Sequence, residues 1–112
     1  MAAVDVVQRQ LDAYNARDLA RFLAEFHDDV KVFRPPAPEP VLSGKAAFAD
    51  FYATQRFDQP QLHAHIVGRL VMGQRVIDHE RISGLGPQPI EMAVVFDVVG
   101  ERIQTMWSFA PA

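Results

Sequence analysis

The sequence contains no cysteine in its 112 residues. Without thiols the chain can form no disulfide bond, no thiolate metal site and no cysteine nucleophile, so redox chemistry does not constrain its compartment. It also lacks any apolar run approaching the roughly 20 residues of a membrane-spanning helix. The first residues show neither the basic segment nor the apolar core of a signal peptide, and we therefore expect a cytoplasmic protein.

Positive charge is scarce and scattered. Lysine and arginine total 11 against 14 acidic residues, a net charge of −3, and no basic stripe or basic amphipathic helix is evident. We therefore expect neither a nucleic-acid partner nor a membrane partner. Apolar residues make up 49% of the sequence, which is enough for one hydrophobic core. We expect a single domain over residues 1–112.

The first half of the chain carries helical patterns. Apolar residues spaced three and four apart predict a helix over Ala3–Asn15, and Asp18 is suited to cap a second helix that reaches Phe26. Ser43 is suited to cap a third helix, Gly44 to about Thr54. The second and third helices are separated by a proline-rich loop that begins after Arg34 and cannot be a helix or a central strand.

The rest of the chain has strand character. A polar turn at His27–Asp29 and a short strand at Val30–Phe33 precede the proline-rich loop. Four β-rich runs separated by glycine-containing turns follow the third helix: Leu62–Val71, Gln74–Ser83, Ile90–Val99 and Ile103–Phe109. Short turns imply hairpins, so the sequence predicts an α+β fold with three helices packed on a curved, mainly antiparallel sheet. A cavity between the two layers is a common ligand site.

Several sequence pieces, taken together and in order, resemble the nuclear transport factor 2-like (NTF2-like) superfamily, in the branch of small bacterial SnoaL-like and ketosteroid isomerase-like proteins. They are residues 14–19, Phe26 with 28–30, Ser43–Gly44, 62–64, Arg69, 76–80, and 98–103 with Trp107. The resemblance implies the cone-shaped, cystatin-like form of the α+β fold. It does not specify a reaction, because this fold hosts isomerases, cyclases, dehydratases, hydrolases and binding modules.

The resemblance also allows the isomerase residues to be checked. Ketosteroid isomerases use a carboxylate base, with a tyrosine and a protonated aspartic acid as hydrogen-bond donors to the developing oxyanion. At these positions the sequence has Arg34, Gln10 and Val94. A guanidinium cannot accept a proton at neutral pH, so we do not expect ketosteroid isomerase activity.

The resemblance places His79 in the cavity as a general acid or base, and Arg34 at its mouth against a ligand carboxylate, enolate or phosphate. These two are the predicted catalytic residues. The alternatives are a structural histidine and a solvent-exposed arginine that stacks on the neighbouring prolines. The remaining predicted ligand contacts are Tyr14, Phe51, His63, Phe96 and Met106.

His63 and His65 must share a face of their strand, because side chains alternate. Whether His79 shares that face depends on the turn at Gly73, which the sequence leaves open. With no thiolates and no third-ligand motif, we expect no metal and no other cofactor.

Asp78 and Glu80 should point away from His79, toward the face that commonly makes the dimer contact in this fold, with Arg69, Arg75 or a partner chain as ion-pair partners. Trp107 could line either the pocket or the dimer interface. Because an exposed tryptophan-rich outer face of the sheet would be a liability, we expect a homodimer that buries this face.

These observations predict a small-molecule-binding domain that acts as an isomerase-, cyclase- or lyase-type enzyme on a small apolar carbonyl or acid compound. The alternative is a non-catalytic ligand-binding or dimeric interaction module.

Overall fold

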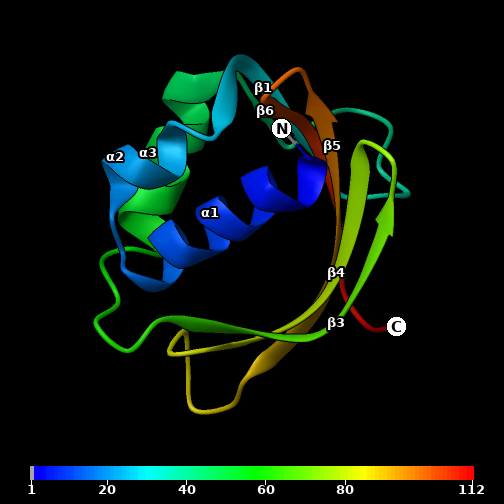
Figure 1. The fold of residues 1–112 in the computed structure, drawn as a ribbon. Helices are drawn as coiled ribbons and strands as arrows, with labels where there is room; N and C mark the ends of the chain where they lie inside the picture. The colour runs from blue at the N-terminus through cyan, green and yellow to red at the C-terminus, as the bar shows by residue number, and fades with distance from the viewer. Residues whose placement is uncertain (1) are drawn as a thin grey trace.

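The computed structural model describes residues 2–112, which form three helices and a six-stranded sheet. In chain order the elements are α1 (Ala3–Asn15), α2 (Leu19–Leu23), β1 (Phe26–Phe33), β2 (Leu42–Ser43), α3 (Lys45–Gln55), β3 (His63–Met72), β4 (Arg75–Ser83), β5 (Ile90–Val99) and β6 (Arg102–Phe109). The sheet curves around the helices, which all lie on its concave side (Figure 1). The predicted α+β class is confirmed.

The strand order is β2-β1-β6-β5-β4-β3. The four strands from β3 to β6 form the expected antiparallel meander. β1 extends the sheet by pairing parallel to β6, and β2 pairs antiparallel to β1. The sheet is therefore mostly antiparallel, with one parallel pair that joins the N-terminal half of the chain to its C-terminal strand.

Three local predictions were wrong. The second helix ends at Leu23, and β1 already begins at Phe26, so residues 27–29 are strand and not a turn. The fully buried Phe26 is aligned with Ile103 of β6, and sheet pairing outweighs the local turn preference of the acidic residues. Ser43 does not cap α3: it lies in β2, and Gly44 is the N-cap residue without a side-chain cap.

The core lies between α1, α2, α3 and the concave side of the sheet. Phe22 of α2, Phe26 of β1 and Phe48 of α3 are each 0–1% exposed. Their ring centroids lie 4.5 to 5.8 Å apart. Because each buried phenylalanine contributes roughly 1.5–3 kcal/mol of hydrophobic stabilisation, this cluster fixes α2 and α3 against the sheet.

The position of α1 is fixed by hydrogen bonds to the sheet. The Asn15 side chain at the end of α1 accepts a bond of 2.8 Å from the Ala64 N–H and donates one of 3.0 Å to the Ala64 carbonyl. This two-bond contact holds the preceding Tyr14 over the sheet, at the edge of a pocket described below.

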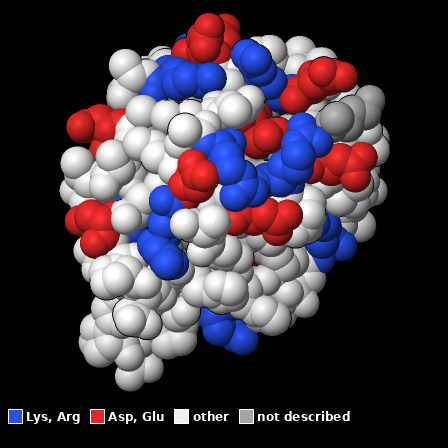
Figure 2. Space-filling view, turned by 60° about the vertical axis from the view of Figure 1, so that its left-hand side comes forward, with Lys and Arg blue, Asp and Glu red and all other residues white. Residues whose placement is uncertain are grey.

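Charged residues of both signs are mixed on the face shown in Figure 2. No helix within residues 2–112 is long and apolar enough to cross a membrane.

Candidate functional site

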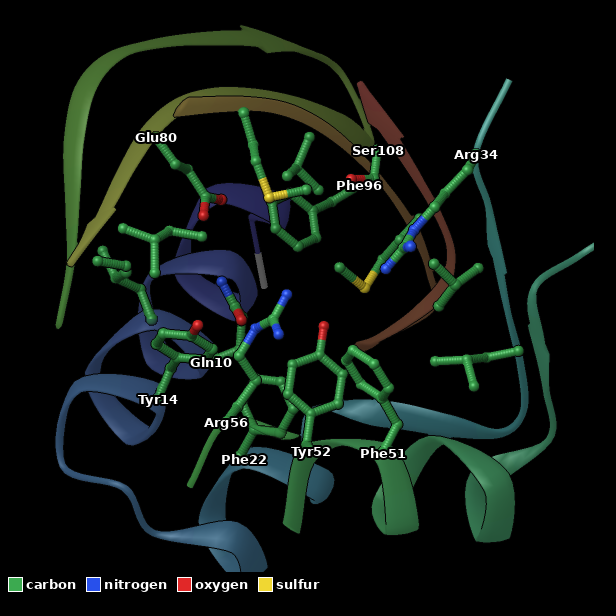
Figure 3. Close-up of a pocket in the computed structure, with 18 residues that line it drawn as sticks. Gln10, Tyr14, Phe22, Arg34, Phe51, Tyr52, Arg56, Glu80, Phe96 and Ser108 are labelled. Atoms are coloured by element: carbon green, nitrogen blue, oxygen red, sulfur yellow. The ribbon is translucent and has the colours of Figure 1, made fainter. Parts of the chain in front are cut away.

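A pocket opens between the helices and the concave side of the sheet. Its inner chamber has a volume of about 50 Å³. The polar residues of the wall are Gln10, Tyr14, Arg34, Tyr52, Arg56, Glu80 and Ser108. Phe51, Phe96 and Met106 are among the apolar ones. Figure 3 shows the Glu80 and Arg34 side chains projecting into the pocket from opposite sides, with the Arg56 side chain between them.

The predicted pocket residues divide into two groups. Arg34, Tyr14, Phe51, Phe96 and Met106 all line the chamber, as expected. His79 and His63 do not line it. The expected placement of these two histidines is therefore wrong, and the physical reason is the side-chain parity of strands β4 and β3.

On β4 the even-numbered residues face the helices. Val76, Asp78, Glu80 and Ile82 are buried, whereas His79 is half-exposed on the convex side. There its Nε2 lies 3.1 Å from Glu91 Oε1. The family resemblance predicted that odd-numbered side chains of this strand face the cavity, whereas the even-numbered ones do. Glu80 therefore occupies the pocket in place of His79.

The strand register across the Gly73 turn shows that His63 and His65 share a sheet face with His79. His63 and His65 are exposed on either side of buried Ala64, and His65 is aligned with Arg81 of the convex face. All three histidines therefore lie on the convex side of the sheet. No group of three or more ligand-type side chains within residues 2–112 is arranged to hold a metal ion.

Asp78 is held by Arg69. The Arg69 guanidinium donates two hydrogen bonds of 2.6 and 2.9 Å to the fully buried Asp78 carboxylate, and a third of 2.7 Å to Gln8 Oε1 of α1. Arg69 was one of the partners expected for Asp78 and Glu80. The expected role in a dimer contact is wrong, because both carboxylates lie under the helices.

Glu80 differs from Asp78 in its partners. The residue is 8% exposed, and no hydrogen bond to its carboxyl group is formed within residues 2–112. Burial raises the pKa of Glu80 to about 7, with a further increase from the Asp78 charge and an opposing effect of Arg69. Glu80 can therefore take up or release a proton near neutral pH.

Two tyrosines stand near Glu80. Tyr14 is 7% exposed, and its Oη has no hydrogen-bond partner within the described chain. Burial, opposed by Arg56, raises the pKa of Tyr14 to about 12 and also raises the pKa of Tyr52. Both hydroxyls stay protonated at neutral pH, so each can donate a hydrogen bond to a ligand oxygen.

Sequence reasoning missed Glu80 and Arg56 as pocket residues. One signal for Glu80 was available: Val76 and Ile82 share its side of β4, so that side carries more aliphatic residues than the side with His79. Arg56 follows α3 directly, where nothing in the local pattern marks a ligand contact.

Comparison with known proteins assigns the family. Residues 7–106 match the SnoaL-like domain. The chain belongs to the SnoaL-like family. This family lies in the NTF2-like superfamily, which confirms the resemblance seen in the sequence. No curated protein matches the sequence.

Solved structures show the same fold. An uncharacterised cystatin-fold protein from Novosphingobium aromaticivorans has a TM-score of 0.84 at 21% identity, covering 96% of this chain and 97% of that one. A computationally designed 17-OHP binder has a TM-score of 0.84 at 13% identity, covering 100% and 94%. A Catenulispora acidiphila protein with a ketosteroid isomerase-like fold, in complex with trimethylamine, has a TM-score of 0.73 at 17% identity, covering 92% and 82%.

Proposed function

We propose that this SnoaL-like protein binds a small carbonyl or acid compound in the pocket and moves a proton on it, as an isomerase- or cyclase-type enzyme. The observation that carries the proposal is Glu80, a buried carboxyl group in the pocket wall with a pKa of about 7 and no hydrogen-bond partner in residues 2–112. Two fold neighbours, one in complex with trimethylamine and one designed as a 17-OHP binder, support the proposal that this chain binds a small molecule.

The proposed step is proton abstraction next to a carbonyl group. The Glu80 carboxylate takes the proton, the C–H electron pair becomes the new C=C bond, and the negative charge develops on the carbonyl oxygen. The Tyr14 hydroxyl, which has no other partner in the described chain, donates a hydrogen bond to that oxygen, and Arg56 adds positive charge. Return of the proton to the same carbon restores the carbonyl compound. In a substrate whose enolate is conjugated with a further C=C bond, return of the proton from Glu80 to the far carbon completes an isomerisation.

This assignment differs from ketosteroid isomerase. The three positions matched to its catalytic groups, Arg34, Gln10 and Val94, all line the pocket, and none of them can act as a base at neutral pH. Glu80 supplies a carboxylate from β4 instead. Ketosteroid isomerase activity by the catalytic groups of that enzyme is therefore still not expected.

Deuterium exchange tests the proposal without knowledge of the natural substrate. Small ketones and oxo acids are incubated with the protein in D₂O, and loss of the proton next to the carbonyl is followed by NMR. We expect exchange above the buffer rate, and a decrease of about 10²- to 10⁴-fold in Glu80→Gln. Glu101→Gln, on the exposed turn before β6, is the matched control and should exchange like the wild type. Binding without exchange would favour the alternative of a non-catalytic binding module.

The convex face of the sheet favours a homodimer as a second element of the proposal. Strand register aligns one row of apolar residues across five strands: Leu70, Ile77, Val95, Trp107 and Phe33. Leu70 is 54% exposed, and Trp107 lines neither the chamber nor its mouth. A continuous apolar row on an open sheet face is suited to packing against a second copy.

A further inference from the structure

The pocket has two compartments that meet at a pair of arginines. An outer vestibule of about 470 Å³ lies beside the inner chamber of about 50 Å³. Both compartments are lined by Arg34, Arg56, Met92 and Ser108, which therefore form the neck between them. Glu80, Tyr14 and Gln10 line only the inner chamber.

The two guanidinium groups at the neck form no ion pair with an acidic residue of the described chain. Arg56 donates one hydrogen bond of 3.3 Å to the Gln55 carbonyl and lies over the Phe51 ring, 5.1 Å from its centroid. Arg34 follows β1 and points into the pocket (Figure 3). Glu91 lines the vestibule, but its carboxylate is bound to His79 at 3.1 Å. The neck therefore carries two guanidinium groups that form no ion pair within residues 2–112.

Two other arginines of the described chain differ from those at the neck. Arg69 and Arg9 are each paired with a carboxylate, Asp78 and Glu25. Guanidinium groups are suited to paired hydrogen bonds with carboxylate or phosphate oxygens. Two of them without such partners at the entrance of a pocket match an oxyanion on the ligand.

The inner chamber limits what passes the neck. At about 10–15 Å³ for each water-sized group, its volume admits roughly three to five such groups. An anionic ligand group inside the chamber would face the Glu80 carboxylate and the charge of Asp78 behind it. The part of the ligand that enters the chamber must therefore be short and uncharged, while the vestibule has room for a larger body.

We infer that the ligand is an organic acid whose oxyanion, carboxylate or phosphate, binds between Arg34 and Arg56 at the neck. Its short neutral end enters the chamber, where Tyr14 and Glu80 meet it. This inference rests on the proposed function for the reacting end only. The anion site does not depend on proton transfer by Glu80.

Three matched compounds test the inference: 4-oxopentanoate, the corresponding (3-oxobutyl)phosphonate and the neutral 4-oxopentanamide. Dissociation constants are measured by calorimetric or NMR titration. We expect at least one acid to bind about tenfold or more tightly than the amide, which corresponds to about 1.4 kcal/mol for a charge-assisted contact. The tighter of the two acids identifies the oxyanion as carboxylate or phosphate.

Variants show whether the neck causes the preference. Arg34→Gln and Arg56→Gln should each reduce the affinity for the preferred acid by about tenfold and leave the amide unchanged. The double variant should bind acid and amide alike. Arg21→Gln, on the exposed side of α2, is the control for loss of one positive charge and should bind like the wild type. Arg56→Lys keeps the charge and should retain a preference for the acid.

Three results would overturn the inference: equal binding of acids and amide by the wild type, a preference that survives in the double variant, or no binding of any of the three compounds. Deuterium exchange of the same compounds separates this inference from the proposed function. Preferred binding of an acid without exchange would keep the anion site and remove proton transfer. If acid and amide bind with equal affinity and both undergo deuterium exchange, proton transfer is kept and the anion site is removed.

Discussion

Arg69 and Asp78 face each other across β3 and β4 on the concave side of the sheet, joined by hydrogen bonds of 2.6 and 2.9 Å. Because Asp78 takes up this guanidinium, Glu80, two residues further along β4, has no arginine of its own. The pair thus fixes the charge beside Glu80 and helps to set its affinity for protons.

Arg69→Met should destabilise the protein strongly. It leaves the fully buried Asp78 carboxylate without its partner, a loss that typically costs about 3–5 kcal/mol. Urea unfolding at neutral pH measures the change. Arg75→Met is the matched control: it breaks another cross-strand pair, Arg75–Asp97, but the Arg75 side chain is 60% exposed and the expected cost is about 1 kcal/mol or less. Equal losses in the two variants would contradict the role given to burial.

Stability should fall as pH rises from about 4.5 to about 7 because of Glu80. Its pKa is about 7 when folded against a reference value of 4.5, so between these values the folded state binds more protons than the unfolded state. The group is neutral in both states below the lower value, and the full cost, up to about 3 kcal/mol, is reached above the folded value.

Glu80→Gln should remove this pH dependence and be more stable than the wild type at pH 8, since the amide needs no desolvation of a charge. Urea unfolding at pH 5 and pH 8 for both proteins gives the comparison. If the free energy of unfolding changes by the same amount between pH 5 and pH 8 in the wild type and in Glu80→Gln, Glu80 is not the responsible group.

His79→Ala should leave pocket chemistry intact. The histidine lies on the convex side of the sheet, paired with Glu91, and does not line the chamber. We expect deuterium exchange within about twofold of the wild type, because no interaction with the reacting atoms is lost. A decrease comparable to that of Glu80→Gln would require a path from His79 to the ligand that the structure does not contain.

The apolar row on the convex face should hold two copies together. Leu70→Glu places a charge at the β3 end of this row, where the proposed contact would bury it, and should convert a dimer to a monomer, as measured by light scattering coupled to gel filtration. Val41→Glu is a control at an exposed apolar residue that is outside this row, 45% exposed, and should leave the mass unchanged. A monomeric wild type would remove the proposed dimer.

The sequence, with its family resemblance, determined the class of fold and five of the 18 residues that line the pocket, Arg34 among them. Periodicity of three and four marked the helices, alternation and short glycine turns marked the meander, and these patterns report burial in each segment directly. For the same reason Tyr14, Phe51, Phe96 and Met106 were predicted correctly as pocket residues: each belongs to a strongly apolar face or to a position that the family resemblance supplied.

Only the tertiary structure decided which polar residues meet. Alternation separates His79 from Glu80 but does not say which of them faces inward, since a shift of one residue exchanges the two sides. The register change between Ile66 and Gly68 places Arg69 opposite Asp78, although uninterrupted alternation from exposed His63 would have turned it outward. Arg34 and Arg56 belong to different elements, and only packing of α3 against β1 brings them to one neck. Local patterns record how far each segment is buried, whereas a site depends on distances between segments, and these are set by the fold as a whole.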